Sequence, residues 1–132
     1  MKKFLFLIQK APFKSESPKL GLTHSLASYV AVIHIDEEIE PVATFVGEGV
    51  LNCIKNQKLE QFYALKSNED HIKQMLLSDM KVLACKEDLE KFNLNEERLI
   101  DAKDLGSETT IKIVPFEEIL KEMETSDHIM VF

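Results

Sequence analysis

Cysteine is scarce in this chain, and no pattern of metal ligands is present. The 132 residues contain two cysteines, Cys53 and Cys85, and four histidines. Two cysteines are too few for a disulfide framework or a cysteine-based structural zinc site, and the histidines do not have metal-ligand spacing. A chain of this length buries roughly two-thirds of its unfolded surface. We therefore expect one domain, residues 1–132, that folds with no metal and no cofactor.

An excess of positive charge is also missing. Lys and Arg number 16 and Asp and Glu number 23, which makes the net charge −7. Duplex-binding proteins usually present a basic face that displaces counterions, so no direct binding to duplex nucleic acid is expected. No apolar run approaches the roughly 18 residues of a membrane span, and the run Phe4–Ile8 is too short for a signal peptide. We expect a soluble cytoplasmic protein without membrane association.

Strand and helix patterns alternate along most of the chain. Apolar runs predict strands, and helical spacing or capping residues predict helices between them. The predicted strands are 3–9, 42–46, 80–85, 111–114 and 128–132, and the predicted helices begin near Ser17, Gly49, Ser67, Lys86 and Pro115. This alternation is typical of right-handed βαβ crossovers, so the sequence predicts an α/β fold with a parallel sheet between helix layers.

The loops that follow the strands are the first places to look for a site, because ligands bind at the carboxyl edge of open parallel sheets. The first loop, Gln9–Ser17, contains Lys10 and Lys14, which form either a solvated face or a cationic rim suited to an anion or a thiolate. It lacks the glycines of a nucleotide phosphate loop. Gly47 and Gly49 follow the second strand, and the simplest interpretation is a tight turn.

Cys85 lies where the third predicted strand ends and a helix begins. Helix amides and the helix dipole favour a thiolate there, but they lower its pKa by less than about one unit. Glu87 and Asp88 act in the opposite direction, and Lys86 offsets only part of their effect. Position alone leaves open a reactive thiol and a small buried apolar residue, and it favours the second. Cys53 is expected in the core, and spacing assembles no catalytic triad around Cys85.

Four segments of the chain resemble the DsrE/DsrF-like (TusD/TusC/TusB-type) family of small sulfur-relay proteins. They are the opening strand, loop and helix at 3–35, the strand and glycine turn at 44–57, the strand and helix around Cys85 at 81–94, and the closing helix and strand at 116–132. The resemblance implies a single flavodoxin-like domain. We therefore expect a three-layer α/β sandwich with a mostly parallel sheet of about five strands.

The resemblance also implies a function. Cys85 is the one position that matches the family's sulfur-carrying cysteine, so it would accept sulfane sulfur as a persulfide and pass it to a partner thiol. The expected partners are sulfur donor and acceptor proteins, in a homo- or hetero-oligomer, with Lys10 and Lys14 stabilising the negative sulfur. The alternative is a non-catalytic assembly or regulatory module in which Cys85 is inert. A flavodoxin-like protein that binds a nucleotide or another small ligand is the least favoured, because the phosphate-loop pattern is missing.

Overall fold

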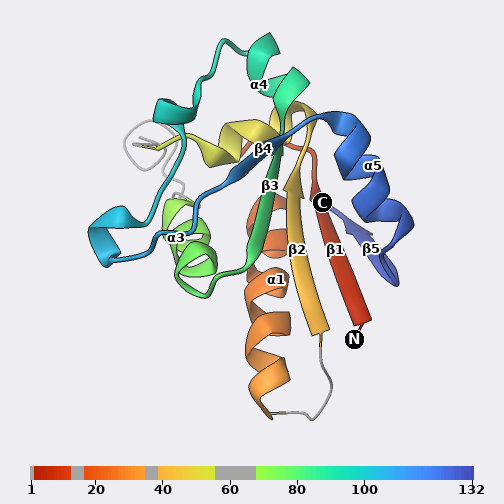
Figure 1. The fold of residues 1–132 in the computed structure, drawn as a ribbon. Coiled ribbons are helices and arrows are strands. Elements are labelled where there is room, and N and C mark those ends of the chain that lie inside the picture. Colours follow the sequence, from red (N-terminus) through yellow and green to blue (C-terminus); the bar gives the residue numbers. More distant parts are fainter. Residues whose placement is uncertain (1, 13–16, 35–38, 56–67) are drawn as a thin grey trace.

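The sheet has five strands, and every described pairing between them is parallel. The computed structural model describes residues 2–12, 17–34, 39–55 and 68–132. The strand order is β4-β3-β2-β1-β5 (Figure 1). The strands are β1 (Lys2–Ile8), β2 (Ile39–Phe45), β3 (Lys81–Cys85), β4 (Lys112–Val114) and β5 (His128–Val131). The predicted α/β fold with a parallel sheet is therefore confirmed.

Helices and short 3-10 turns connect these strands. They are α1 (Ser17–His34), η1 (Gly47–Cys53), α3 (Glu69–Leu77), α4 (Lys86–Lys91), η2 (Glu96–Arg98), η3 (Lys103–Leu105) and α5 (Phe116–Glu124). The short helix predicted after the second strand is the 3-10 turn η1. Ser67, where a helix was predicted to begin, lies outside the described residues, and the residue that precedes α3 is Asn68.

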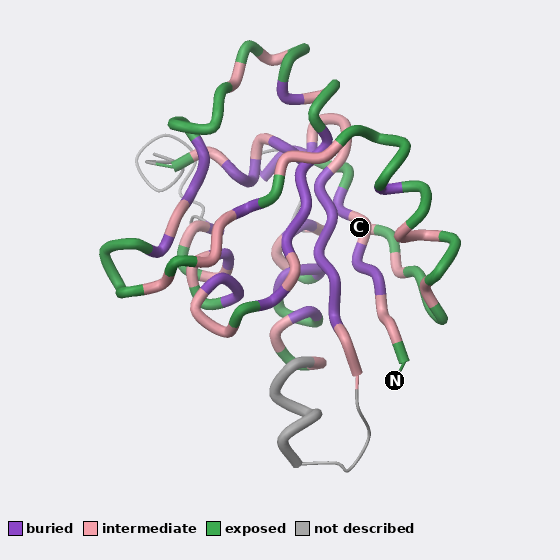
Figure 2. The backbone as a smooth tube through the Cα atoms, in the orientation of Figure 1, coloured by how far each residue is buried: buried purple, intermediate pink, exposed green. Residues whose placement is uncertain are grey.

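The two faces of the sheet are covered by different helices. α1 and α3 contact each other on one face, where Ile8, Phe45 and Ala84 of the strands are fully buried. α5 lies on the other face, above the buried side chains of Leu5 and Leu83. The central strands are thus buried on both sides (Figure 2), which explains why they appear in the sequence as nearly continuous apolar runs.

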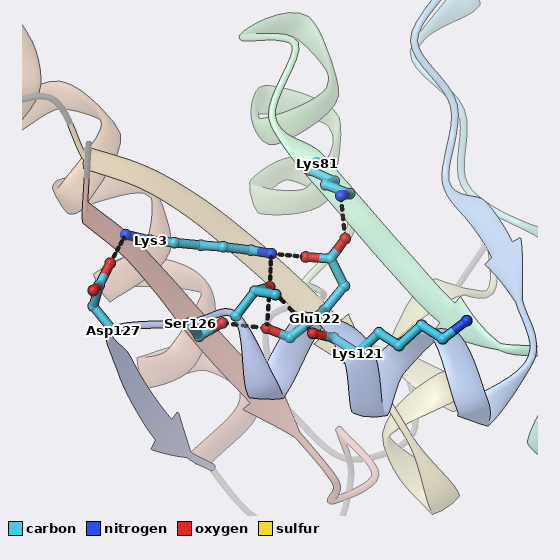
Figure 3. A network of polar contacts seen from close by, with 7 residues as sticks. Lys3, Lys81, Lys121, Glu122, Ser126 and Asp127 are labelled. Atoms are coloured by element: carbon cyan, nitrogen blue, oxygen red, sulfur yellow. Dashed lines mark hydrogen bonds and ion pairs between the residues drawn. The ribbon is translucent and has the colours of Figure 1, made fainter.

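A charged network fastens the C-terminal part of α5 to the sheet (Figure 3). The carboxylate of Glu122 pairs with Lys3 of β1 and with Lys81 of β3. The Lys3 ammonium also donates to Thr125 Oγ1 at 2.9 Å, and the Lys3 backbone amide donates to Asp127 Oδ2 at 2.7 Å. Because these contacts lie at the amino ends of β1 and β3, the first turn of α5 lies at the carboxyl edge of the sheet.

No helix in the described ranges has the length and apolar character needed to cross a membrane.

Candidate functional site

Cys85 is both the last residue of β3 and the residue that precedes α4. Its backbone is extended, with φ −70° and ψ 120°. The residue is only 1% exposed, and its Sγ donates a hydrogen bond to Glu87 Oε2 at 3.3 Å. The thiol is therefore enclosed by protein and paired with a carboxylate from the first turn of the following helix.

The same Glu87 oxygen accepts a second hydrogen bond. The backbone amide of Phe116, the first residue of α5, donates to it at 2.9 Å. Pro115, which precedes α5, provides no side-chain cap, so Glu87 caps this helix from another element. Glu87 itself is exposed. The sulfur of Cys85 consequently lies beneath a side chain that faces solvent.

Asp88 joins α4 to the turn after β2. Its Oδ2 accepts a hydrogen bond from the backbone amide of Gly47 at 2.7 Å. Gly47 has φ +55°, a left-handed conformation that favours glycine. At Gly49 a Cβ atom would lie 2.0 Å from the carbonyl oxygen of Ile8, so this position has no room for a side chain. Both glycines act as the tight turn predicted from the sequence, and they place this turn beside α4.

The surroundings of Cys85 oppose its ionisation. Burial is the largest cause and raises the pKa of the thiol to about 12, with further increases from Asp88 and Glu87. The backbone amide of Asp88 lowers the pKa, as expected at a helix start, but the other causes outweigh it. At pH 7 the thiol is therefore almost entirely protonated in this arrangement.

Glu87 is held in its charged form. Hydrogen bonds from its own backbone amide, from the Phe116 amide and from the Cys85 thiol lower the pKa of its carboxyl group below the usual value. At neutral pH the pair therefore consists of a protonated Cys85 and an ionised Glu87. A carboxylate of such low basicity is a poor acceptor for the thiol proton, so Glu87 does not activate Cys85 while the two remain hydrogen-bonded.

Of the two lysines predicted to form a cationic rim, the structure describes Lys10 and does not describe Lys14. Lys10 is exposed just beyond β1, and its carbonyl oxygen accepts a hydrogen bond from Asn52 Nδ2 at 3.0 Å. Lys10 follows β1, and β2 separates β1 from β3, so Lys10 does not follow a strand adjacent to the one that ends in Cys85. Lys14 lies outside the described residues. In the described part of the chain, the charged side chains that act on Cys85 are Glu87 and Asp88.

Two features of this region were not predicted from the sequence. One is the link between Glu87 and Phe116, which are 29 residues apart in the chain. The other is a buried amide pair, in which Asn68 Nδ2 donates to Asn52 Oδ1 at 3.0 Å. Asparagine is typical of loops and helix caps, so its sequence pattern does not show that it is buried. The position of Glu87, two residues after Cys85 in a first helical turn, pointed to its effect on the thiol but to neither of these contacts.

The site lies where the chain leaves neighbouring strands towards opposite faces. After β3, residues 86–111 pack against η1 and α3, with Ile100 N bonded to Cys53 O at 2.7 Å and Ser107 Oγ bonded to Leu76 O at 3.1 Å. After β4, the chain crosses to the other face as α5. In open parallel sheets, ligands bind at the carboxyl ends of two adjacent strands whose following connections run to opposite faces of the sheet. Cys85, Glu87 and Phe116 meet at this point of the carboxyl edge.

Comparison with known proteins points to one family. A family model described as the DsrE/DsrF-like family matches residues 2–132. The fold is similar to that of the ychN protein from E. coli, with a TM-score of 0.76 and 17% sequence identity over 100% of both chains. It is also similar to MTH1491 from Methanobacterium thermoautotrophicum, with a TM-score of 0.64 and 13% identity, again over 100% of both chains.

A third solved structure, BT1422 from Bacteroides thetaiotaomicron, has a TM-score of 0.56 and 18% identity and covers 98% of this chain and 94% of its own. No curated protein matches the sequence. At these identities the structural likeness shows the shared fold alone.

Proposed function

The chain belongs to the DsrE/DsrF-like family, and on this premise we propose that it is a sulfur carrier that accepts sulfane sulfur on Cys85 and passes it to a partner thiol. The observation that carries the proposal is the place of Cys85. It ends β3 at the carboxyl edge, beside the start of α5 and beneath the exposed side chain of Glu87. A cysteine at this edge needs only a local rearrangement to meet a second protein.

The proposed reaction consists of two thiolate exchanges. In the first, the Cys85 thiolate attacks the terminal sulfur of a donor persulfide or polysulfide. A new sulfur–sulfur bond forms on Cys85, the donor's sulfur–sulfur bond breaks, and the donor leaves as a thiolate. In the second, an acceptor thiolate attacks the terminal sulfur on Cys85, and the Cys85 thiolate leaves. The electrons balance without an external oxidant or reductant.

This chemistry requires a change from the resting arrangement, because the nucleophile is the thiolate and not the thiol. The exposed Glu87 carboxylate binds the thiol and disfavours its ionisation. Movement of this side chain towards solvent would free the thiol from that hydrogen bond without disturbing the buried strands. The carrier function therefore depends on a state in which Glu87 is displaced.

The partners in this proposal are sulfur donor and acceptor proteins, in a homo- or hetero-oligomer in the cytoplasm, where thiols are kept reduced. Cys53 and Cys85 are both free. Lys10 and Lys14 would serve as a cationic rim that attracts the anionic donor. Slower sulfur loading of a variant that carries both Lys10→Gln and Lys14→Gln would support the rim, and an unchanged loading rate would remove it from the mechanism.

A second candidate function is a non-catalytic assembly or regulatory module. The observation that favours it is the state of Cys85, which is 1% exposed and has a pKa raised to about 12. If Glu87 never leaves, the thiol is inert and the protein acts through its surface alone. The two candidates differ in one measurable property, which is sulfur uptake by the native protein.

The test is the intact mass of the protein under non-reducing conditions after incubation with a polysulfide, with Cys85→Ser and Cys53→Ser as variants. We expect the parent and Cys53→Ser to gain the mass of added sulfur, reductant to remove it, and Cys85→Ser to gain none. No uptake by a parent protein with reduced thiols would instead favour the assembly module.

A further inference from the structure

We propose that Glu87 is a gate on Cys85: its carboxylate closes the site by binding the thiol and the start of α5 together, and sulfur chemistry requires it to swing away. This inference rests on the proposed function and names the regulation of the same site. Glu87 is a positioning residue in this account, since it acts through the cysteine and takes no part in the sulfur exchange.

The gate has two attachments that share one atom. Glu87 Oε2 accepts from Cys85 Sγ at 3.3 Å and from the Phe116 amide at 2.9 Å. The cysteine is fixed at the end of a buried strand, whereas the Glu87 side chain is exposed. Rotation of the carboxylate into water therefore breaks two hydrogen bonds and moves no core side chain. The closed state is also coupled to the position of α5, since that helix provides one of the two donors.

The neighbouring charges single out Glu87 as the group that can move. On α4, Asp88 is the other carboxylate that acts on Cys85, but it is held by the Gly47 amide of η1 at 2.7 Å. Lys86 is the cation of α4 that acts on Glu87. From α5, the group that reaches Glu87 is the Phe116 amide, and Glu117 and Glu118 in its first turn are exposed. Displacing Glu87 therefore removes one of the two carboxylates that act on Cys85. The bond between Asp88 and Gly47 keeps α4 in place meanwhile.

The test measures the reactivity of the Cys85 thiol, independently of sulfur transfer. The parent is the full chain with Cys53→Ser, so that Cys85 is its only cysteine. Glu87→Gln removes the charge and keeps an oxygen that can accept from Phe116. Glu90→Gln is the matched control, because Glu90 is exposed on the same helix. Each protein reacts with iodoacetamide, a small neutral reagent, over a range of pH.

We expect Glu87→Gln to react about tenfold faster than the parent at pH 7.5, with its pH profile moved to lower pH. The Glu87 carboxylate raises the pKa of the thiol through their hydrogen bond, so its loss lowers that pKa and increases the thiolate fraction. The lower intrinsic nucleophilicity of a more acidic thiolate offsets part of this gain. Glu90→Gln should react at the parent rate, and Glu87→Ala at least as fast as Glu87→Gln.

Equal rates and equal pH profiles for the parent and Glu87→Gln would overturn the gate. So would faster alkylation of Cys53 when Glu87→Gln is placed in the Cys85→Ser protein, because that result would mean general loosening of the fold. Polysulfide uptake is measured separately on the same proteins. If Glu87→Gln accelerates alkylation but no protein takes up sulfur, the gate holds and the proposed function fails. If sulfur loads on Cys85 and alkylation is unchanged, the gate fails and the proposed function holds.

Discussion

Gly49 lies so close to β1 that no side chain fits at this position. Its missing Cβ would be 2.0 Å from the carbonyl oxygen and 2.7 Å from the carbonyl carbon of Ile8, which are backbone atoms that cannot turn aside. The same turn presents the Gly47 amide to Asp88. The glycines thus keep α4, and with it Cys85, in register with the end of β1.

Replacing Gly49 with alanine should destabilise the protein by about 3 kcal/mol, at the upper end of the cost of inserting a methyl group into a packed site. Gly106→Ala is the comparison, because no atom lies within 4 Å of a Cβ there, and its φ of +88° alone should cost about 1 kcal/mol. Urea unfolding of both variants measures the difference. Equal midpoints for the two variants would contradict the close packing at Gly49.

For single residues, the sequence predicted the place of Cys85 along the chain better than the side chains and amides that surround it. The place of Cys85 between a strand and a helix followed from the apolar run before it and the acidic first turn after it, and the structure has it there. Position alone also favoured its burial, but the bond from Phe116 to Glu87 did not follow, because it depends on a helix that begins 29 residues after Glu87. Local patterns contain no information on such a contact.

Among the described elements, α5 is the helix that covers its face of the sheet, and a few charged groups hold it there. Burial by itself would raise the pKa of Glu122, but hydrogen bonds from Lys3 and Lys81 and their positive charges outweigh it, so the pKa is lowered. The carboxylate therefore contributes stability at pH values above about 4.3, the ordinary value in the unfolded chain. This contribution is lost as the pH falls through the lower value of the folded state.

Glu122→Gln should therefore lower the free energy of unfolding by about 2 kcal/mol at pH 7, because two lysines lose their partly buried partner. The difference from the parent should shrink as the pH falls below 4. Urea unfolding at pH 7 and pH 3 measures both effects. Glu124→Gln, on the exposed side of the same helix, should have little effect. A loss of the same size at both pH values would show that the charge of Glu122 does not hold α5.

Most elements were predictable because each has a local cause. Apolar runs predicted all five strands, and Pro115 followed by an apolar stripe predicted α5. The partners of the last strand were not predictable, because the run Ile129–Phe132 suits a central or an edge strand equally well. The structure places β5 at the edge, paired with β1. Gly21 allows this, since the Phe132 ring lies 2.9 Å from where a Cβ of Gly21 would be.

Across the whole molecule, the strand order makes the first and last strands neighbours and places the site on two other strands, β3 and β4. β1 and β5 are neighbours, with the Phe132 amide bonded to Leu7 O at 2.8 Å. The site lies at the carboxyl ends of β3 and β4, where the chain turns to opposite faces. Membership of the DsrE/DsrF-like family, and not the geometry, is the reason to propose sulfur chemistry at this buried thiol.

Whether Cys85 carries sulfur is decided by measuring sulfur on each cysteine before and after transfer to an acceptor. The native protein is loaded from a polysulfide, freed of excess donor and incubated with a small acceptor thiol, and peptides are analysed by mass before and after that step. We expect added sulfur on the peptide with Cys85 and none on the peptide with Cys53, and we expect the sulfur to appear on the acceptor as the Cys85 peptide loses it. Sulfur on Cys53, or none on either cysteine, would contradict this expectation.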